Sequence, residues 1–364
     1  MIEDIIGGIA EIAFDIIATS GQNAKKDRRI KKAAEIIQNG GLVAFPTETV
    51  YGLGADAFDA KAVERIYMAK GRPADNPLIL HVANTQQFLD LTSDLPHYAA
   101  TLMHKYWPGP LTFIAKKKPG LPGWLGGHPS SSTNTIGVRM PSHPVAKAFL
   151  EAAGCPVAAP SANKSGRPSP TTARHVKDDF ASGDVDYILD GINAKIGIES
   201  TVLDITGDYP VILRPGAITR EMIEEVIPVA NPADFQTENP RSPGIKYRHY
   251  APKAPMQILS GSPQNIANHI LMECNARTSD SERIGVFVTE TTKNILAESK
   301  PPNVKIITID NDQNIIAQNL FANLRQFDKL NVSKIYAEAI PSSNIGTAIM
   351  DRMLKAAEGS ILSV

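Results

Sequence analysis

The sequence contains little cysteine, few aromatic residues and almost no net charge. Only Cys155 and Cys274 occur among its 364 residues, so neither a disulfide framework nor a four-cysteine metal site can be built. The formal net charge is −1, and a near-neutral chain is not recruited to nucleic acid or to an anionic membrane by its overall charge. A contact with RNA would need a local basic patch. The run Lys116-Lys117-Lys118 is the candidate, although such a run is more often a solvated loop.

The chain also lacks an apolar stretch long enough to cross a bilayer. Its first residues are apolar, but Glu3 and Asp4 stand where a signal peptide carries lysine or arginine. We therefore expect a cytoplasmic protein with reduced thiols and no membrane partner. A hydrophobic content of 43% with 21% charged residues indicates a folded chain. Its length favours two domains.

Hydrophobic periodicity divides the chain into four segments. Isoleucines at helical spacing predict an amphipathic helix over the first 18 residues, within an N-terminal extension of residues 1–23. Apolar runs alternate with helical patterns over residues 24–230, which predicts a mixed α/β domain with a sizeable sheet. Residues 231–255 are rich in proline and predict a linker. Residues 256–364 alternate regularly between strand and helix patterns, which predicts a smaller, Rossmann-like, mainly parallel sheet.

Six polar segments stand at the ends of expected strands in the first domain. They are PTETVYGLG at 46–54, KGRP at 70–73 with NPL at 76–78, TIGVRMP at 135–141, APSANKSGRPS at 159–169, EST at 199–201 and RPG at 214–216. Each segment alone has an ordinary explanation as a turn or a helix cap. Six of them in one domain predict a ligand site, because α/β proteins bind ligands where strands end.

The cationic residues in these segments favour an anionic ligand. Lys70 and Arg72 flank a glycine, so a phosphate could approach closely and the guanidinium could hold two of its oxygens. Arg139 ends an expected strand, where it forms either a surface salt bridge or an anchor for an anion. Residues 52–57 fit a loose G-x-G-x-x-A dinucleotide pattern, but polar residues separate them from the preceding strand, so we interpret the match as coincidental.

Several common catalytic motifs are missing from the sequence. It contains no G-x-x-x-x-G-K-[ST] phosphate loop, no H-E-x-x-H metal motif and no G-x-S-x-G nucleophile elbow. We expect no protein-bound metal site and no covalent intermediate.

Taken in order, the six segments resemble the YrdC-like family, in particular its long, two-domain threonylcarbamoyl-AMP synthases. The motif SPGIKYRHYAP at 242–252 and the α/β region after it are features of the long form. The resemblance runs from about residue 24 to the C-terminus. It implies a twisted mixed sheet with a large cavity, followed by a Rossmann-like domain.

The resemblance implies a nucleotidyltransferase that joins L-threonine, bicarbonate-derived CO2 and ATP into threonylcarbamoyl-AMP and pyrophosphate. ATP would be a substrate, and Mg2+ would neutralise the departing pyrophosphate. The product would serve a downstream threonylcarbamoyl transferase complex that modifies tRNA. Two anionic reactants must meet at the α-phosphate, so such a site needs fixed positive charge more than a nucleophile.

The resemblance also implies individual roles. Lys70 and Arg72 would be catalytic, and the linker would fold over the nucleotide as a lid through Tyr247, His249 and Tyr250. The implied ATP contacts are Arg72, Asn76, Thr135, Ser161, Ser169, Arg214, Tyr247 and Tyr250. The implied threonine contacts are Thr49, His81, Arg139, Ala159 and Ser200.

Two other functions compete with this interpretation. An RNA-binding module is disfavoured by the near-neutral charge and sparse basic clustering. A carbamoyl transferase of the hydrogenase-maturation type would need cysteine-rich zinc sites, which two cysteines cannot furnish.

Overall fold

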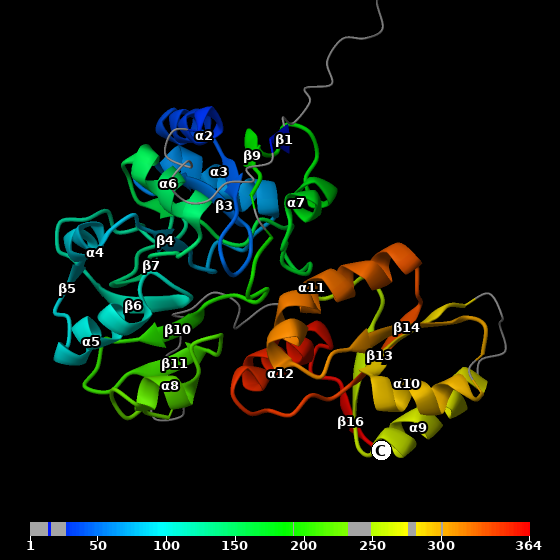
Figure 1. The fold of residues 1–364 in the computed structure, drawn as a ribbon. Coiled ribbons are helices and arrows are strands. Elements are labelled where there is room, and N and C mark those ends of the chain that lie inside the picture. The colour runs from blue at the N-terminus through cyan, green and yellow to red at the C-terminus, as the bar shows by residue number, and fades with distance from the viewer. Residues whose placement is uncertain (1–13, 16–26, 192, 232–248, 276–281, 300) are drawn as a thin grey trace, which may run out of the picture.

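The computed structural model describes residues 14–15, 27–191, 193–231, 249–275, 282–299 and 301–364. They form two α/β domains that lie side by side (Figure 1). The N-terminal domain is built on a mixed sheet and the C-terminal domain on a parallel one, which confirms the expected fold class.

The sheet of the N-terminal domain has eleven strands among the described residues, in the order β1-β9-β2-β3-β8-β4-β7-β6-β10-β11, with β5 paired to β6. The strands are β1 (Phe14–Asp15), β2 (Val43–Phe45), β3 (Gly52–Asp56), β4 (Ile79–His81), β5 (Thr92–Ser93), β6 (Leu111–Lys117), β7 (Thr135–Arg139), β8 (Val157–Ala158), β9 (Tyr187–Leu189), β10 (Thr201–Asp204) and β11 (Val211–Arg214). Strands β4 and β7 are parallel neighbours, so His81 and Arg139 lie opposite each other at their carboxyl ends.

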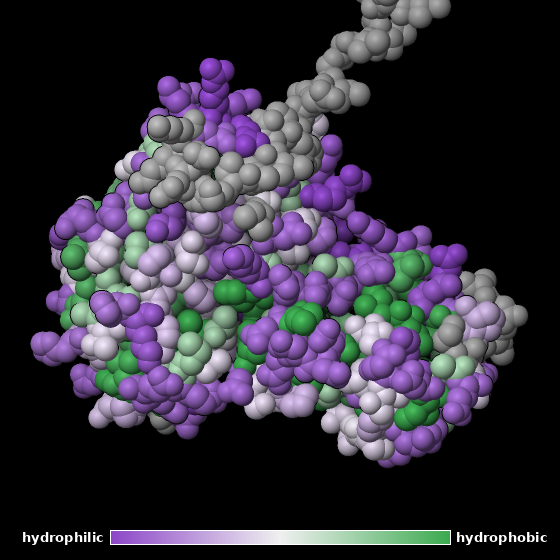
Figure 2. All heavy atoms as spheres, in the orientation of Figure 1, coloured by the Kyte–Doolittle hydropathy of each residue, from purple (hydrophilic) through white to green (hydrophobic). Residues whose placement is uncertain are grey.

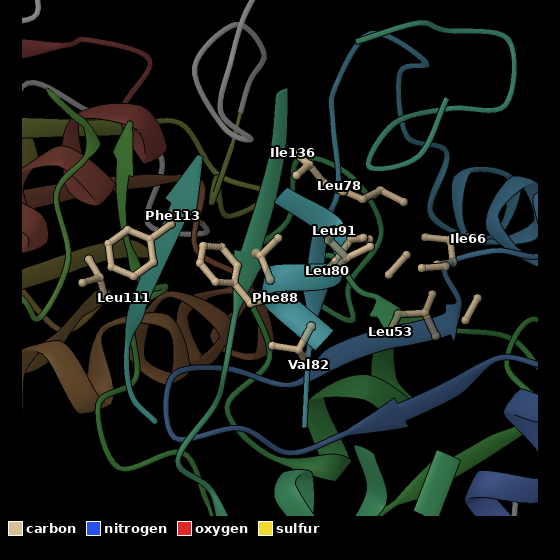
Figure 3. Close-up of a cluster of buried hydrophobic side chains, with 14 of the residues drawn as sticks. Leu53, Ile66, Leu78, Leu80, Val82, Phe88, Leu91, Leu111, Phe113 and Ile136 are labelled. Atoms are coloured by element: carbon tan, nitrogen blue, oxygen red, sulfur yellow. The ribbon is translucent and has the colours of Figure 1, made fainter. Parts of the chain in front are cut away.

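Helices cover both faces of this sheet. The helices are α2 (Arg28–Gln38), α3 (Ala60–Lys70), α4 (Thr85–Leu91), α5 (His97–Tyr106), α6 (Pro144–Ala153), α7 (Ala173–Asp179) and α8 (Arg220–Glu224). Helices α2 and α6 pack on one apolar core, and the other five share a second, larger core with the strands. Figure 3 shows part of the larger core, where Ile66 of α3 and Phe88 of α4 lie near Leu53, Leu80 and Phe113 of the sheet. These side chains are at most 2% exposed, so the apolar faces of the helices hold them on the sheet.

The C-terminal domain alternates strand and helix without interruption. Its elements are β12 (Met256–Ser260), α9 (Pro263–Asn275), β13 (Ile284–Thr289), α10 (Glu290–Ala297), β14 (Val304–Ile309), α11 (Gln313–Leu330), β15 (Lys334–Glu338), α12 (Ile345–Ala356) and β16 (Ile361–Ser363). The strands pair in parallel in the order β14-β13-β15-β12-β16. Helices α9 and α10 cover one face, while α11 and α12 cover the face toward the N-terminal domain (Figure 1).

The contact between the domains is apolar and ionic. Val50 and Ile198 of the N-terminal domain belong to the same apolar cluster as residues of α11 and α12. Arg325 of α11 donates both terminal nitrogens to the Asp179 carboxylate, at 2.9 and 2.6 Å. Both side chains are at least 95% buried. A buried ion pair of this kind contributes more to the geometry of the interface than to its stability, because each charge loses its hydration.

Five elements differ from the sequence analysis. Residues Gly52–Asp56 form β3, where a loop was expected, and α4, β5 and β16 were not predicted. In the expected N-terminal helix, Phe14–Asp15 instead form β1, which pairs with β9. The rest of that helix, and residues 232–248 of the expected linker, lie outside the described residues. No described helix combines the length and apolarity that a membrane crossing needs, and the face drawn in Figure 2 is hydrophilic over most of its area.

The close contact between the two domains leads to a prediction for Gly197. Its φ is +80°, and a Cβ there would collide with the backbone of Gln318 in α11. Gly197→Ala should therefore place an alanine in a left-handed backbone conformation and overpack the contact with α11. Together these effects should lower the free energy of unfolding by about 2–4 kcal/mol. Gly154, with φ +73° and open space around its missing Cβ, is the matched control, and Gly154→Ala should cost only about 1 kcal/mol. Urea unfolding measures both, and equal losses would contradict this account of the interface.

Candidate active site

One cavity of the N-terminal domain collects the polar ends of several strands. It has about 740 Å³ of space between its walls, part of it open to solvent. Strands β4, β7, β8 and β11 deliver their carboxyl ends to it, and the loops before β3 and β10 complete the walls. Its charged lining consists of Lys70, Arg72, Arg139, Arg167, Arg214 and Glu199. Five cationic side chains against one carboxylate make this a site for an anion.

The five residues assigned to threonine by resemblance all line this cavity. Thr49, His81 and Arg139 form one part of the wall, and Ser200 and Ala159 line it as well. The parallel pairing of β4 with β7 explains why two of them meet. The structure thus brings the five together, although they are spread over more than 150 residues of sequence.

Arg139 is already engaged by the protein. Its Nε donates to the Gly109 carbonyl at 3.2 Å, and its Nη1 donates to Thr49 Oγ1 at 2.8 Å. Its Nη2 lies 2.6 Å from Glu48 Oε1 in a buried ion pair. A guanidinium has five N–H donors, so protons on both terminal nitrogens remain for a carboxylate ligand.

The Glu48 carboxylate balances the Arg139 charge. Burial raises the pKa of Glu48, but the adjacent guanidinium more than offsets this, so the pKa lies below its ordinary value. Glu48 itself is 6% exposed and does not line the cavity. It therefore holds the arginine in place from behind.

His81 is a neutral side chain with an unused polar atom. It is 5% exposed, and its ring packs edge-on against Phe45 with centroids 5.8 Å apart. Burial and the Arg139 charge lower the pKa of His81 to about 3. Its Nδ1 is buried without a hydrogen-bond partner among the described residues. Such an atom in a cavity wall requires an explanation, and a polar ligand supplies one.

Arg72 and Asn76 form one unit on the nucleotide side. Arg72 donates Nε to the Asn76 carbonyl at 3.0 Å and Nη2 to the Asn76 side chain at 2.8 Å. Burial lowers the pKa of Arg72 to about 10, so the guanidinium stays charged at neutral pH. Asn76 is buried but does not line the cavity. Its contact with a ligand would therefore pass through Arg72.

Arg214 approaches the same cavity from β11. Its Nε donates to the Ser200 carbonyl and its Nη2 to Ser200 Oγ, both at 3.1 Å. Ser200 Oγ also lies 2.8 Å from Thr112 Oγ1. Arg72 and Arg214 thus face one space, and the hydrogen bonds of Arg214 join the threonine side of the wall to the nucleotide side.

Lys70 serves the loop that follows β8. Its Nζ donates to the carbonyl oxygens of Ser161 and Asn163. Burial, reinforced by the Arg72 charge, holds the pKa of Lys70 well below its ordinary value. These contacts indicate that Lys70 positions the loop, a role different from the phosphate contact suggested by resemblance. Ser161 lines the cavity and donates Oγ to the Asn163 side chain at 2.6 Å.

The described end of the linker reaches the cavity. Both His249 and Tyr250 line it. Tyr250 has a φ of +63°, and its ring stacks on Phe321 of α11 with centroids 5.1 Å apart. Burial lowers the pKa of His249 to about 4, and its Nε2 has no hydrogen-bond partner among the described residues. Tyr247 lies outside the described residues.

Thr135 does not come to this cavity. It begins β7, whereas Arg139 ends the same strand, about 13 Å away at the usual rise per residue. Thr135 lines a different surface pocket, together with Lys116, Lys117 and Lys118. Its expected contact with ATP is therefore not supported by its position.

Other residues of the cavity were not assigned a role from the sequence. Arg167 and Asn163 line it, and Arg167 pairs with Asp179 at 2.7 Å. Glu199 accepts a hydrogen bond from Ser169 Oγ, and Arg352 of the C-terminal domain binds the same carboxylate at 3.0 Å. Arg167, Asn163 and Glu199 lie within the recognised motifs, but no sequence pattern singles out Arg352.

Comparison with known proteins decides between the possible functions. A family model described as "Telomere recombination" (Sua5, YciO and YrdC) matches residues 35–216, and a model of the "Threonylcarbamoyl-AMP synthase, C-terminal domain" matches residues 218–358. A threonylcarbamoyl-AMP synthase of Bacillus subtilis is 45% identical over 339 residues, which cover 92% of this chain and 95% of the relative. The chain belongs to the threonylcarbamoyl-AMP synthase family.

Other members of the threonylcarbamoyl-AMP synthase family support this assignment. The crystal structure of Pyrococcus abyssi Sua5 complexed with L-threonine superposes with a TM-score of 0.83 at 38% identity, over 96% of this chain and 98% of that one. A shorter synthase, from Nitrosococcus oceani, is 36% identical over 48% of this chain and 92% of its own length. These similarities support the adenylate-forming interpretation and neither of its competitors.

The neutral His81 predicts a pH dependence of stability. The unfolded chain takes up a proton there near pH 6.5, whereas the folded chain does not until about pH 3, so acid favours unfolding between these values. This group alone should cost about 2 kcal/mol of folding free energy between pH 7 and pH 5. His81→Gln should remove that part of the loss, as measured by urea unfolding at both pH values. The exposed His104 provides the control, and an identical pH dependence in His81→Gln and His104→Gln would contradict the buried, neutral state.

Proposed function

We propose that this chain condenses L-threonine, bicarbonate-derived CO2 and ATP into threonylcarbamoyl-AMP and pyrophosphate, and so provides the activated group for modifying an adenosine of tRNA. One observation carries the proposal. Arg72 and Arg214, assigned to the nucleotide, line the same cavity as His81 and Arg139, assigned to the amino acid. Threonine and ATP could therefore be held at the same time and next to each other.

The central step of the proposed reaction is the attack of one anion on another, after the threonine amine has added CO2 and released a proton. Threonine's amine adds CO2, and the resulting N-carboxylate attacks the α-phosphorus of ATP, which forms a new P–O bond and breaks the bond to pyrophosphate. The excess of cationic side chains in the lining lowers the repulsion between these partners. Placing both reactants in one cavity also removes the entropy cost of their encounter.

The amino-acid side of the cavity suits a zwitterionic ligand. The remaining protons on Arg139 suit a carboxylate. The neutral His81 can accept a hydrogen bond from an ammonium or hydroxyl group through its unused Nδ1. Because His81 stays uncharged above about pH 3, it does not repel the ammonium group.

The nucleotide side provides charge and hydroxyl groups. Asn76 and Pro77 hold Arg72 through its Nε and Nη2, which fixes its charge in the cavity wall. Ser161 and Ser169 line the cavity and can bind phosphate or ribose oxygens. We infer that Lys70 acts by holding the loop of Ser161.

Mg2+ is part of this proposal as a companion of the ATP phosphates. Among the residues that the structure describes, no group of three or more potential ligands could hold a metal ion. The two carboxylates near the cavity, Glu48 and Glu199, face Arg139 and Arg352. We therefore assign neutralisation of the leaving pyrophosphate to the arginines and to the metal that accompanies ATP.

We also propose several further features that the sequence led us to expect. These are the division at residues 23, 230 and 255, the lid formed by the linker, the cytoplasmic location, the use of bicarbonate, and a downstream transferase complex with tRNA. The positions of His249 and Tyr250 in the cavity wall support the lid.

Removing either nucleotide-side arginine tests the proposed function. With ATP, threonine and bicarbonate, the chain should release pyrophosphate only when threonine is present. Arg72→Ala and Arg214→Ala should each lower the rate about 100-fold or more, because one fixed charge at the transition state is lost. Arg174, 75% exposed on α7, is the matched control, and Arg174→Ala should keep the rate. Threonine-dependent release at the wild-type rate in Arg72→Ala and Arg214→Ala, with circular dichroism unchanged, would refute the assignment of the site.

A further inference from the structure

Arg352 of α12 is a fully buried cation contributed by the C-terminal domain. It is 0% exposed, and its contacts reach three segments around the cavity. Its Nε donates to Glu199 Oε2 at 3.0 Å, and its Nη1 donates to the Pro215 carbonyl at 2.8 Å. Its guanidinium carbon lies 5.7 Å from the centre of the Tyr250 ring. One side chain thus joins the loop before β10, the loop after β11 and the end of the linker.

The Glu199 carboxylate carries this contact into the cavity. Its second oxygen accepts a hydrogen bond from Ser169 Oγ, and both Glu199 and Ser169 line the cavity. Burial raises the pKa of Glu199, but the charges of Arg352 and Arg214 more than offset this, so the carboxylate stays ionised. Because Arg352 neutralises it, this carboxylate does not oppose the phosphates of a nucleotide.

The hydrogen bond from Arg352 to the Pro215 carbonyl helps to fix the position of Arg214. Pro215 follows Arg214 directly in sequence, and the next residue, Gly216, lies so close to Thr201 that a Cβ would collide with that residue's backbone nitrogen. The loops 199–201 and 214–216 are therefore packed together without room for adjustment. Arg352 binds both of them and does not itself line the cavity.

We propose that Arg352 is a positioning residue for the nucleotide, through which the C-terminal domain completes the ATP side of the site. This inference rests on the proposed function. Without Arg352, the buried Glu199 carboxylate keeps Arg214 as its main cationic partner, and it therefore competes with ATP for that guanidinium. The defect should fall on ATP more than on threonine, because Ser200 is the one proposed threonine contact that adjoins the loop held by Arg352, whereas His81 and Arg139 do not contact Arg352.

The test compares two measurements on the full chain. Arg352→Gln should raise the KM for ATP about tenfold or more, which is the usual loss for a hydrogen bond to a charged group. The Kd for threonine, measured by calorimetry without ATP, should change by less than about threefold. An equal loss in both would show a general structural defect and overturn the proposal.

A double variant isolates the effect of the carboxylate charge. Combining Arg352→Gln with Glu199→Gln removes both charges while keeping an acceptor for Ser169. Its KM for ATP should be lower than that of Arg352→Gln alone, because no carboxylate is left there to compete for Arg214. The double variant also serves if Arg352→Gln does not fold. A KM for ATP as high as in the single variant, or higher, would count against the mechanism.

Arg325 supplies a matched control for domain docking. It too is a buried arginine that crosses from the C-terminal domain, but it binds Asp179 and the Pro168 carbonyl and does not contact Glu199. Arg325→Gln should lower the thermal midpoint without a comparable rise in the KM for ATP. If Arg325→Gln raised that KM as much as Arg352→Gln does, the effect would belong to docking and the proposal would fail. A wild-type chain that releases no pyrophosphate would refute the proposed function itself, which is a separate outcome.

Discussion

The organisation of this molecule depends on placing counter-charges behind a cationic cavity. Five cationic side chains share one lining, and buried like charges repel strongly when water is excluded. Glu48 pairs with Arg139 from behind the wall, and Glu199 stands next to Arg214 while Arg352 balances it in turn. The cavity therefore keeps its positive character, while the carboxylates prevent the arginines from separating.

The same constraint explains how the two domains are joined. Their interface contains the apolar cluster of Val50 and Ile198 with α11 and α12, and ionic contacts at Asp179 and Glu199. Those two acidic residues belong to the N-terminal domain, and both arginines belong to the C-terminal one. The C-terminal domain thus adds a second cation to each of two buried acids, beside Arg167 and Arg214 of the N-terminal domain, so its attachment contributes to the electrostatics of the site.

The sequence predicted the fold class because regular periodicity decides it. It also indicated most residues of the cavity, since the motifs stand at strand ends that the sheet brings together. The sequence did not predict the strand Gly52–Asp56, because its glycines are poor strand formers. Phe45 and Val157 approach these glycines so closely that no side chain would fit. Tertiary packing therefore overrides local propensity there. The sequence also grouped Thr135 with Arg139, although the two lie at opposite ends of β7 and line different pockets, which proximity in sequence does not reveal. Arg352 gave no signal, since only the three-dimensional contact with Glu199 distinguishes it from a surface helix residue.

The position of Arg352 near the end of the chain also bears on biosynthesis. It lies 153 residues beyond Glu199, in the last helix before β16. During translation the mixed sheet can form while this helix has not yet been made, because domains fold in order from the N-terminus. The nascent chain therefore carries a pocket whose Glu199 still lacks its Arg352 partner, and the pocket matures only after α12 has been made.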